Sequence, residues 1–279
     1  MTRYVAIALA LIAAGSAQAA EKKLDRTFTV SPGGSLTVDA DGGEVQVSGN
    51  DGNQVVVHVT VRGSERNVSD TEIDAVQKTD GVAVTLRKKK HSWFFFGSWS
   101  SDEKIEVTVP RRYMVNVHTG GGSVDLRDTA GVASLHTSGG DVSAKNVNGN
   151  LEVRTSGGSI RVDTIRGDVD ADTSGGDVYL LHVDGKIRGD TSGGSVRCSL
   201  VGANRGISAS TSGGDIEVIL PQGTTGTVDL STSGGSINSE LQVKSSVRKD
   251  TVLVGSLNGG GEAIYAHTSG GSVSLREQN

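Results

Sequence analysis

Apolar and polar residues alternate with a period of two in short runs along most of the chain, and these runs recur about every 18 residues. In one unit, Leu151, Val153 and Thr155 alternate with polar residues, and Ile160 and Val162 do the same after a glycine pair. Strict alternation over four to eight residues is typical of half-buried strands. Two short strands per unit, in constant phase, predict stacked coils. We therefore expect an all-β fold, a parallel β-solenoid or β-helix with two short strands per coil of about 18 residues.

Each unit carries the motif Thr-Ser-Gly-Gly, followed by Asp or Ser and then Val or Ile. The threonine shares the inward parity, which predicts a ladder of hydroxyls at one corner, and the glycine pair permits φ > 0 and a sharp corner without a Cβ clash. Alternation of Ser and Asp at the next position would keep like charges two strands apart. The repeat threonines are Thr119, Thr137, Thr155, Thr173, Thr191, Thr211, Thr232 and Thr268. The gap before the last one spans two periods, so we expect its polar segment 244–250 to be an enlarged loop.

Aligned on this motif, the apolar positions form columns that should face the core. One column is Val115, Ala133, Leu151, Val169, Ile187, Ile207, Val228 and Ile264, and another is Val124, Val142, Ile160, Val178, Val196, Ile216, Ile237 and Val273. Cys198, the single cysteine, falls in an inward column, so we expect a buried and unreactive thiol.

The first part of the chain lacks the strict motif but keeps strand patterning. Terminal repeats of a solenoid are usually atypical because an exposed end must be capped. We expect a single domain over residues 20–279, in which 24–112 form an N-terminal cap with degenerate coils and 113–279 form the regular coils. Within the cap, 41–47 resembles a degenerate first coil, 55–62, 82–86 and 105–109 are predicted strands, and 64–78 is expected to be a loop or a short helix.

Residues 1–19 have the pattern of a secretory signal peptide, with Arg3, a short apolar stretch and Ala17-Gln18-Ala19 as the cleavage site. No cysteine follows directly, so we expect no lipid anchor, and no later stretch reaches transmembrane length. The sequence thus predicts a periplasmic or secreted protein, and we expect a monomer. The net charge of −5 argues against nucleic-acid binding.

One segment is a compositional outlier, with both tryptophans and three of the four phenylalanines next to a run of lysines. It lies between two predicted strands, so we expect the tip of a hairpin. The rings either pack over the solenoid end as a plug or form an exposed patch for a membrane surface, a glycan or an envelope protein. The patch would consist of Lys88, Lys89, Lys90, Trp93, Phe94, Phe95, Phe96 and Trp99.

The signal peptide, the strand-rich N-terminal region, the Thr-Ser-Gly-Gly-Asp-Val repeats and a late Leu257-Asn258-Gly259-Gly260-Gly261 together resemble the bacterial putative-adhesin family of β-strand-repeat proteins, a domain of unknown function. The resemblance covers roughly residues 24–279. It implies a β-helix-like fold and a cell-envelope setting, and it brings no catalytic motif.

A polysaccharide lyase or glycosidase is the enzymatic alternative, because such reactions need paired carboxylates on one face. The candidate surface contains Glu152, Arg154, Asp168, Asp170, Asp172, Lys186, Arg188 and Asp190. Cross-strand pairing, with Asp168 facing Lys186, Asp170 facing Arg188 and Asp172 facing Arg154, explains these charges without catalysis. His118 and His136 share an outward position on adjacent coils, but a metal usually needs three or four ligands.

We therefore expect no cofactor, no metal site and no catalytic residue. The first functional hypothesis is a non-catalytic envelope protein that acts as an adhesin-like interaction scaffold for an unknown ligand. The alternatives are a carbohydrate-active enzyme on the same scaffold, and a structural or stress-response module of the envelope.

Overall fold

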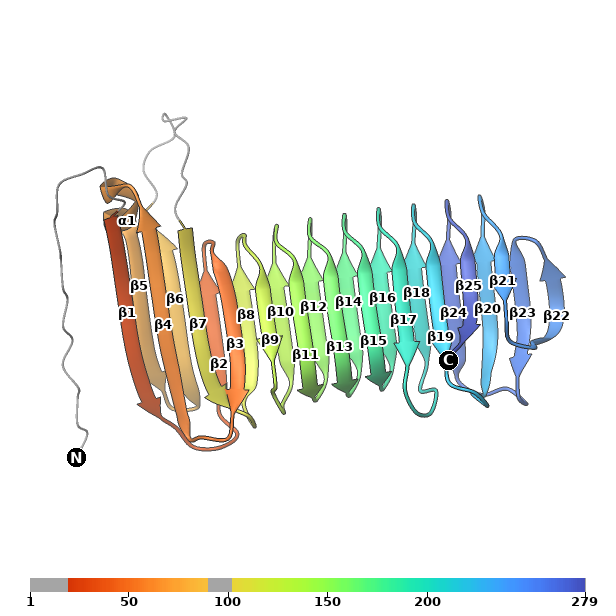
Figure 1. Ribbon diagram of the computed structural model, residues 1–279, viewed down its shortest axis with the longest axis horizontal. Coiled ribbons are helices and arrows are strands. Elements are labelled where there is room, and N and C mark those ends of the chain that lie inside the picture. The colour runs from red at the N-terminus through yellow and green to blue at the C-terminus, as the bar shows by residue number, and fades with distance from the viewer. Residues whose placement is uncertain (1–19, 90–101, 279) are drawn as a thin grey trace.

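The computed structural model describes residues 20–89 and 102–278 of the chain. They form two long β-sheets that face each other along an elongated body, with the N-terminal strands at one end (Figure 1). In the described residues the first sheet has 12 strands, in the spatial order β1 (Ala20–Thr29), β4 (Gln54–Gly63), β7 (Asp102–Pro110), β3 (Glu44–Asn50), β9 (Val124–Arg127), β11 (Val142–Asn148), β13 (Ile160–Arg166), β15 (Val178–Asp184), β17 (Val196–Leu200), β19 (Ile216–Leu220), β25 (Val273–Glu277) and β21 (Ile237–Ser239).

The second sheet has 13 strands within the same residues, again in spatial order: β22 (Lys244–Lys249), β23 (Val252–Leu257), β20 (Gly226–Thr232), β24 (Ala263–Thr268), β18 (Ile207–Thr211), β16 (Ile187–Thr191), β14 (Val169–Thr173), β12 (Leu151–Thr155), β10 (Ala133–Thr137), β8 (Met114–Thr119), β2 (Ser35–Ala40), β6 (Gly81–Lys88) and β5 (Thr71–Lys78). Each regular coil contributes one strand to each sheet, and the coils stack in parallel. The predicted parallel β-solenoid with two strands per coil is confirmed.

The core fills the space between the two sheets with the inward columns of the repeat. All members of the column from Val115 to Ile264 are at most 2 % exposed, and so are those of the other column except Ile237, which is partly buried on an edge strand. Removal of this apolar area from water, worth roughly 25 cal/mol per Å², drives the coils together. Because the alternation has a period of two, a slip of one residue would expose every one of these side chains, and the register is therefore well specified.

The repeat threonines form the expected ladder at the corner between the sheets. All eight are buried. Thr155 Oγ1, for example, donates to the carbonyl oxygen of Gly140 in the preceding coil at 2.9 Å, and it accepts from the backbone N–H of Gly158 at 3.3 Å. A buried hydroxyl without such partners would be costly. The threonine thus ties its own turn to the turn of the coil before it.

Of the two causes expected for the glycine pair, the avoided Cβ clash is the one that the structure supports. The second glycine is required by close stacking, because a Cβ on Gly158 would lie 2.1 Å from the carbonyl oxygen of Gly140. A Cβ on the first glycine would meet nothing within 4 Å at Gly139, but it would lie 3.0–3.2 Å from a neighbouring atom from Gly175 onward. A left-handed φ occurs in the pair only at Gly122, so that expectation was wrong for the other copies.

The alternating Ser and Asp after the glycine pair form a second ladder along the same corner. Asp141 Oδ1 accepts from the backbone N–H of Ser159 at 2.7 Å, and Ser159 Oγ accepts from the N–H of Asp177 at 3.2 Å. The same bonds continue to Ser195 and Asp215. Both side-chain types accept a hydrogen bond from the next coil, so alternation keeps the ladder while separating the carboxylates by two strands.

The opposite corner has left-handed backbone at a fixed position of four successive coils. The residues there are Asp128, Asn146, Thr164 and His182, with φ between 52° and 62°. Asp and Asn tolerate this conformation because their side chains bond locally, whereas a β-branched residue such as Thr164 is strained in it.

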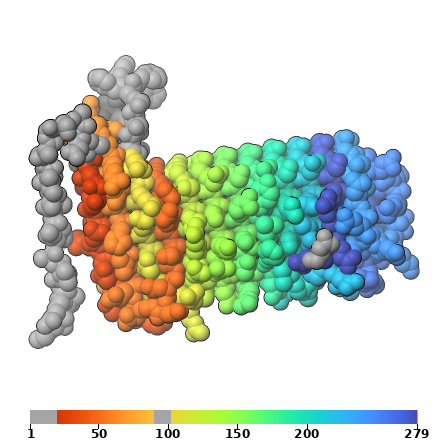
Figure 2. Space-filling model, in the orientation of Figure 1, coloured from red at the N-terminus to blue at the C-terminus, as the bar shows by residue number. Residues whose placement is uncertain are grey.

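The coils at both ends are not stacked in chain order. Strands β24 and β25, the last coil of the chain, lie between β18–β19 and β20–β21. Figure 2 shows part of this coil as a dark blue band inside the lighter blue of the C-terminal region. At the other end, the coil of β2 and β3 is second in the stack, because β6 and β7 lie outside it. Internal placement of the terminal coil hides strands that would otherwise be open edges.

Antiparallel strands close each end of the solenoid. The segment expected to be a loop at 244–250 is instead mainly the exposed edge strand β22, paired with β23, so that expectation was wrong. At the N-terminal end, α1 (Glu65–Asp70) and β5 occupy the segment predicted as a loop or short helix, and α1 packs against β1, β4 and β5. The predicted strands of the cap are confirmed as parts of β4, β6 and β7, whereas β1 had not been predicted.

Candidate functional site

The outward positions of the first sheet depart from the repeat at one place. Along one outward column, neighbouring strands carry Arg127, Lys145 and Asp163, as expected for a solvated face. Further along, the equivalent residues are Leu181 and Ile219, two half-buried apolar side chains. Apolar residues that point away from a core need another explanation than the fold.

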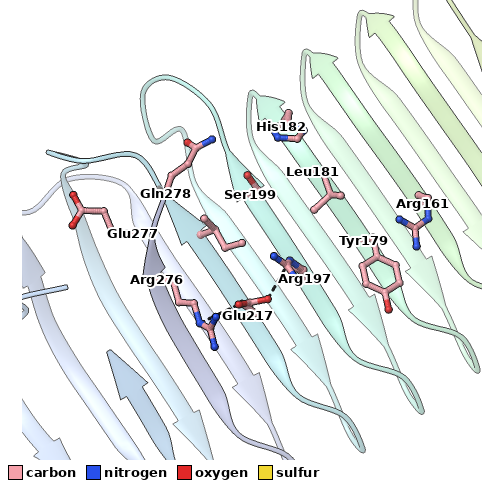
Figure 3. A pocket seen from close by; sticks show the side chains of 11 residues that line it. Arg161, Tyr179, Leu181, His182, Arg197, Ser199, Glu217, Arg276, Glu277 and Gln278 are labelled. Carbon is pink, nitrogen blue, oxygen red and sulfur yellow. Dashed lines mark ion pairs between the residues drawn. The ribbon is translucent and has the colours of Figure 1, made fainter. Parts of the chain in front are cut away.

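These two residues belong to a shallow surface depression of about 470 Å³. That volume is within the range of small-molecule sites. Figure 3 shows the side chains that line it, which come from β13, β15, β17, β19, β25 and the residues next to them. We call it the arginine depression and define it by Arg161, Tyr179, Leu181, Arg197, Glu217, Ile219 and Arg276.

Glu217 holds two of the arginines in place. Its carboxylate oxygens lie 3.1 Å from Arg197 Nε and 3.1 Å from Arg276 Nε (Figure 3). Glu217 is 20 % exposed at its side chain, whereas both arginine side chains are about half exposed. Arg276 Nε also lies 3.8 Å from Glu240, so two carboxylates accompany these two guanidinium groups. Each guanidinium carries five N–H donors, more than these contacts occupy.

Arg161 is fixed by an aromatic ring instead of a carboxylate. Its guanidinium carbon lies 4.7 Å from the centre of the Tyr179 ring, which is a cation–π contact. The Tyr179 hydroxyl donates to Asp177 Oδ2 at 3.2 Å, so the ring is held at its far end. A guanidinium stacked on a ring keeps its planar edge of donors available, and such an edge matches a carboxylate.

His182 lines the depression at the left-handed corner. Its Nδ1 lies 2.8 Å from Asp163 Oδ1. Burial acts to raise the pKa of Asp163, but the hydrogen bonds from His182 and Thr164 outweigh it, so the pKa is below its ordinary value. Asp163 is therefore a carboxylate at neutral pH and is engaged by its own neighbours.

The carboxylates proposed from the sequence lie on the other sheet, where their charges are mutually satisfied. Arg154 Nε lies 2.8 Å from Glu152, and Arg188 Nε lies 2.8 Å from Asp190 and 3.7 Å from Asp170. The expected cross-strand pair of Asp170 and Arg188 is present, but the closer contacts run along one strand. Each arginine has a raised pKa, chiefly because of its hydrogen bond to the carboxylate on its own strand.

Two other carboxylates of that set differ in role. Asp168 Oδ1 accepts from the backbone N–H of Lys186 at 2.9 Å, so the expected ion pair with the lysine side chain is replaced by a turn contact. Asp172 pairs in register with Arg154 on one side and with Asp190 on the other.

His118 and His136 lie side by side on β8 and β10, with ring centres 5.0 Å apart and nearly parallel. Among the described residues, no group of three or more His, Cys, Asp or Glu side chains is arranged to hold a metal ion.

Two lysines of the patch predicted from the sequence form ion pairs with glutamates of the cap. Lys88 Nζ lies 2.7 Å from the carboxylate of Glu103, which is only 2 % exposed, and Lys89 Nζ lies 3.2 Å from Glu72. Lys90, Trp93, Phe94, Phe95, Phe96 and Trp99 lie outside the described residues. The flanking strands β6 and β7 belong to different sheets, so the expectation that they are the paired arms of a hairpin was wrong.

Cys198 is buried on β17, as expected from its column. Burial raises the pKa of its thiol to about 12. The thiol is therefore neutral and shielded at physiological pH.

Sequence reasoning missed the arginine depression. The available signal was the pair of outward apolar residues, Leu181 and Ile219, in a column that is otherwise polar. These two residues are recognised as outward-facing only when the alternation of inward and outward positions is counted from the repeat threonine into the second strand of each coil.

The described residues thus define a capped parallel β-solenoid with two sheets, and a depression lined by three arginines on the outer face of one of them. The family model for Toastrack DUF4097 matches residues 34–276. The chain belongs to the Toastrack DUF4097 family, and this confirms the resemblance inferred from its repeats. A search of curated proteins found no match.

Several solved structures are similar to this chain over most of its length. A "putative adhesin" from Parabacteroides distasonis is 14 % identical, covers 92 % of this chain and 97 % of its own, and superposes with a TM-score of 0.45. A "putative adhesin" from Parabacteroides merdae is 12 % identical, with 95 % and 98 % covered and a TM-score of 0.42. A "putative lipid binding protein" from Parabacteroides distasonis is 15 % identical, with 92 % and 97 % covered and a TM-score of 0.38.

Proposed function

We propose that this protein is a non-catalytic interaction scaffold of the bacterial cell envelope, and that it binds its ligand at the arginine depression. The observation that carries the proposal is the departure from the repeat at this place. Aromatic, apolar and cationic side chains gather in one concavity of an otherwise polar face. Elsewhere in the described residues, the repeated Thr, Ser and Asp side chains are engaged in holding the coils together.

Export is part of this proposal. The signal-peptide pattern of residues 1–19 supports it, although these residues lie outside the described ones. No helix in the described part of the chain is long and apolar enough to cross a bilayer. The continuous core supports treating residues 20–279 as one domain with a rigid face for binding.

The experiment is a binding assay with isolated bacterial envelopes and fluorescently labelled protein. We expect saturable binding by the wild type and at least a tenfold loss with the double variant Arg161→Gln and Arg197→Gln. The matched control is Arg248→Gln with Lys249→Gln on β22, which removes the same charge from an exposed edge far from the depression. Equal binding by the double variant and the wild type would refute the proposed site. Turnover of an envelope polysaccharide by the wild type would refute the non-catalytic function.

A further inference from the structure

The spacing of the arginines suggests what kind of ligand the depression accepts. Arg161, Tyr179 and Arg197 occupy equivalent outward positions on the successive strands β13, β15 and β17. Neighbouring strands are about 4.8 Å apart, so the two arginine positions are separated by about 9.6 Å along the solenoid axis. A ligand that engages both must carry anionic groups at about that separation, or one anionic group and a second polar contact.

Apolar side chains lie beside the arginines, with Leu181 on the strand between Arg161 and Arg197 and Ile219 on the strand beyond Arg197. Leu181 follows Tyr179 by two residues on β15, and Ile219 follows Glu217 by two on β19, so the apolar side chains lie beside the charged column (Figure 3 labels Leu181). Aromatic and apolar side chains in shallow sites can bury the C–H face of a sugar ring, while guanidinium groups bind the carboxylate that the ring carries.

The site carries little net charge. Three arginines and two glutamates, Glu217 and Glu277, line the depression, and Glu240 lies 3.8 Å from Arg276, while the whole chain carries a net charge of −5. Long-range attraction therefore does not favour polyanions, and binding of one would depend on local contacts.

We propose that the arginine depression binds an acidic polysaccharide, one whose sugar rings carry carboxylates at about every second residue. This inference rests on the proposed function and names the ligand class of that site. One carboxylate would bind the donor edge of Arg161, and a second would reach Arg197. The intervening ring would lie over β15 beside Leu181, and the next ring beyond Arg197 would extend toward Ile219 on β19. The polymer would run across the strands, along the solenoid axis.

Glu217 gives this inference a distinctive consequence. It neutralises part of the charge on Arg197 and Arg276 without contacting the bound carboxylates. Glu217→Gln should therefore raise the affinity for an acidic oligosaccharide several-fold, whereas loss of a merely structural ion pair would lower it or leave it unchanged.

The test is calorimetric titration of the purified chain with hyaluronan octasaccharides, in which a carboxylate occurs on alternate sugars, and with neutral laminarin oligosaccharides. We expect saturable binding of the acidic probe alone, at least a tenfold loss with Arg161→Gln or Arg197→Gln, and less than a twofold change with Arg248→Gln. Thermal melts of every variant show whether it is folded. The variant Arg161→Lys keeps the positive charge but lacks the planar donor edge, so we expect it to retain only part of the wild-type affinity.

Three results would overturn the inference: no binding of the acidic probe, equal binding of the neutral probe, or equal losses with Arg161→Gln and Arg248→Gln. Vesicles containing an anionic lipid serve as a further probe, and binding to vesicles without binding to the oligosaccharide would contradict the saccharide assignment. If the depression variants lose envelope binding but the wild type ignores the acidic probe, the ligand class is wrong and the proposed function stands. If they keep envelope binding, the proposed function fails as well.

Discussion

Adjacent glycines of one repeat should respond in opposite ways to the same substitution. A Cβ on Gly140 would lie 2.0 Å from the carbonyl oxygen of Gly122, whereas a Cβ on Gly139 would meet nothing within 4 Å. The first distance is 1.0 Å short of the 3.0 Å that real Cβ atoms essentially never go below, so two coils must separate locally. Overpacking of this kind costs about 1–3 kcal/mol.

The separation would also weaken the hydrogen bond from Thr137 Oγ1 to Gly122 O, now 2.9 Å, which adds about 1 kcal/mol. We therefore expect Gly140→Ala to lower the free energy of unfolding by about 2–4 kcal/mol. Gly139→Ala should raise it by about 0.4–1 kcal/mol, because alanine restricts the unfolded chain and the backbone there is not left-handed.

The assay is urea unfolding followed by far-ultraviolet circular dichroism, with size-exclusion chromatography as a check that both variants remain monodisperse. The two substitutions change the same residue type one position apart, so each controls for the other. If Gly140→Ala were as stable as the wild type, or if both substitutions destabilised equally, the close-stacking explanation of the repeat would be refuted.

The remaining predictions concern strain, an ion pair and the thiol. Thr164→Asn should raise the free energy of unfolding by about 0.5–1 kcal/mol, because asparagine tolerates left-handed backbone. The reverse change at the equivalent position, Asn146→Thr, should lower the free energy of unfolding by at least as much. Urea unfolding midpoints of the two variants show whether the two effects have opposite signs. Lys88→Met leaves a buried carboxylate without its lysine and should cost about 1–3 kcal/mol. Lys89→Met removes an exposed pair and should cost less than about 0.5 kcal/mol, so equal melting shifts would contradict this assignment. Cys198 should resist a thiol reagent at pH 8 until denaturant is added, and prompt labelling of the native protein would show that it is not shielded. Because its pKa is raised on folding, its contribution to stability is complete below the ordinary thiol pKa and is lost as the pH rises toward about 12.

The regular coils could be predicted from the sequence because one repeat specifies both the strand parity and the corner. Thr155 and Gly158 recur in phase with the apolar columns, so the inward face, the corner and the stacking direction follow from the same alignment. The cause of the glycine pair could not be obtained in this way. Left-handed turns and close stacking both select glycine, and only the distance between coils separates them.

The ends were less predictable because their pairing is not local. The column that contains Val228 and Ile264 is correct, but nothing in the sequence shows that the coil of Ile264 lies between the coils of Ile207 and Val228. Likewise, β22 is polar and fully exposed, and an edge strand with such residues has the composition of a loop.

The candidate site was not predicted, because its charged residues fit the pattern of the repeat. Arg161, Arg197 and Glu217 have the composition of a solvated strand face, and their common neighbourhood with Tyr179 depends on stacking four coils in register. Leu181 is the equivalent of Asp163 on the neighbouring strand, and it gains significance only when Tyr179 and Arg197 are known to lie on the same face.

The most direct test of the account is a crystal structure of this protein with a bound glucuronate-containing tetrasaccharide. We predict one carboxylate at the donor edge of Arg161, another at Arg197, a sugar ring beside Leu181 and the next ring toward Ile219, with the saccharide running across β13, β15, β17 and β19. Density for the saccharide at another surface, with the arginine depression occupied only by solvent, would contradict the account.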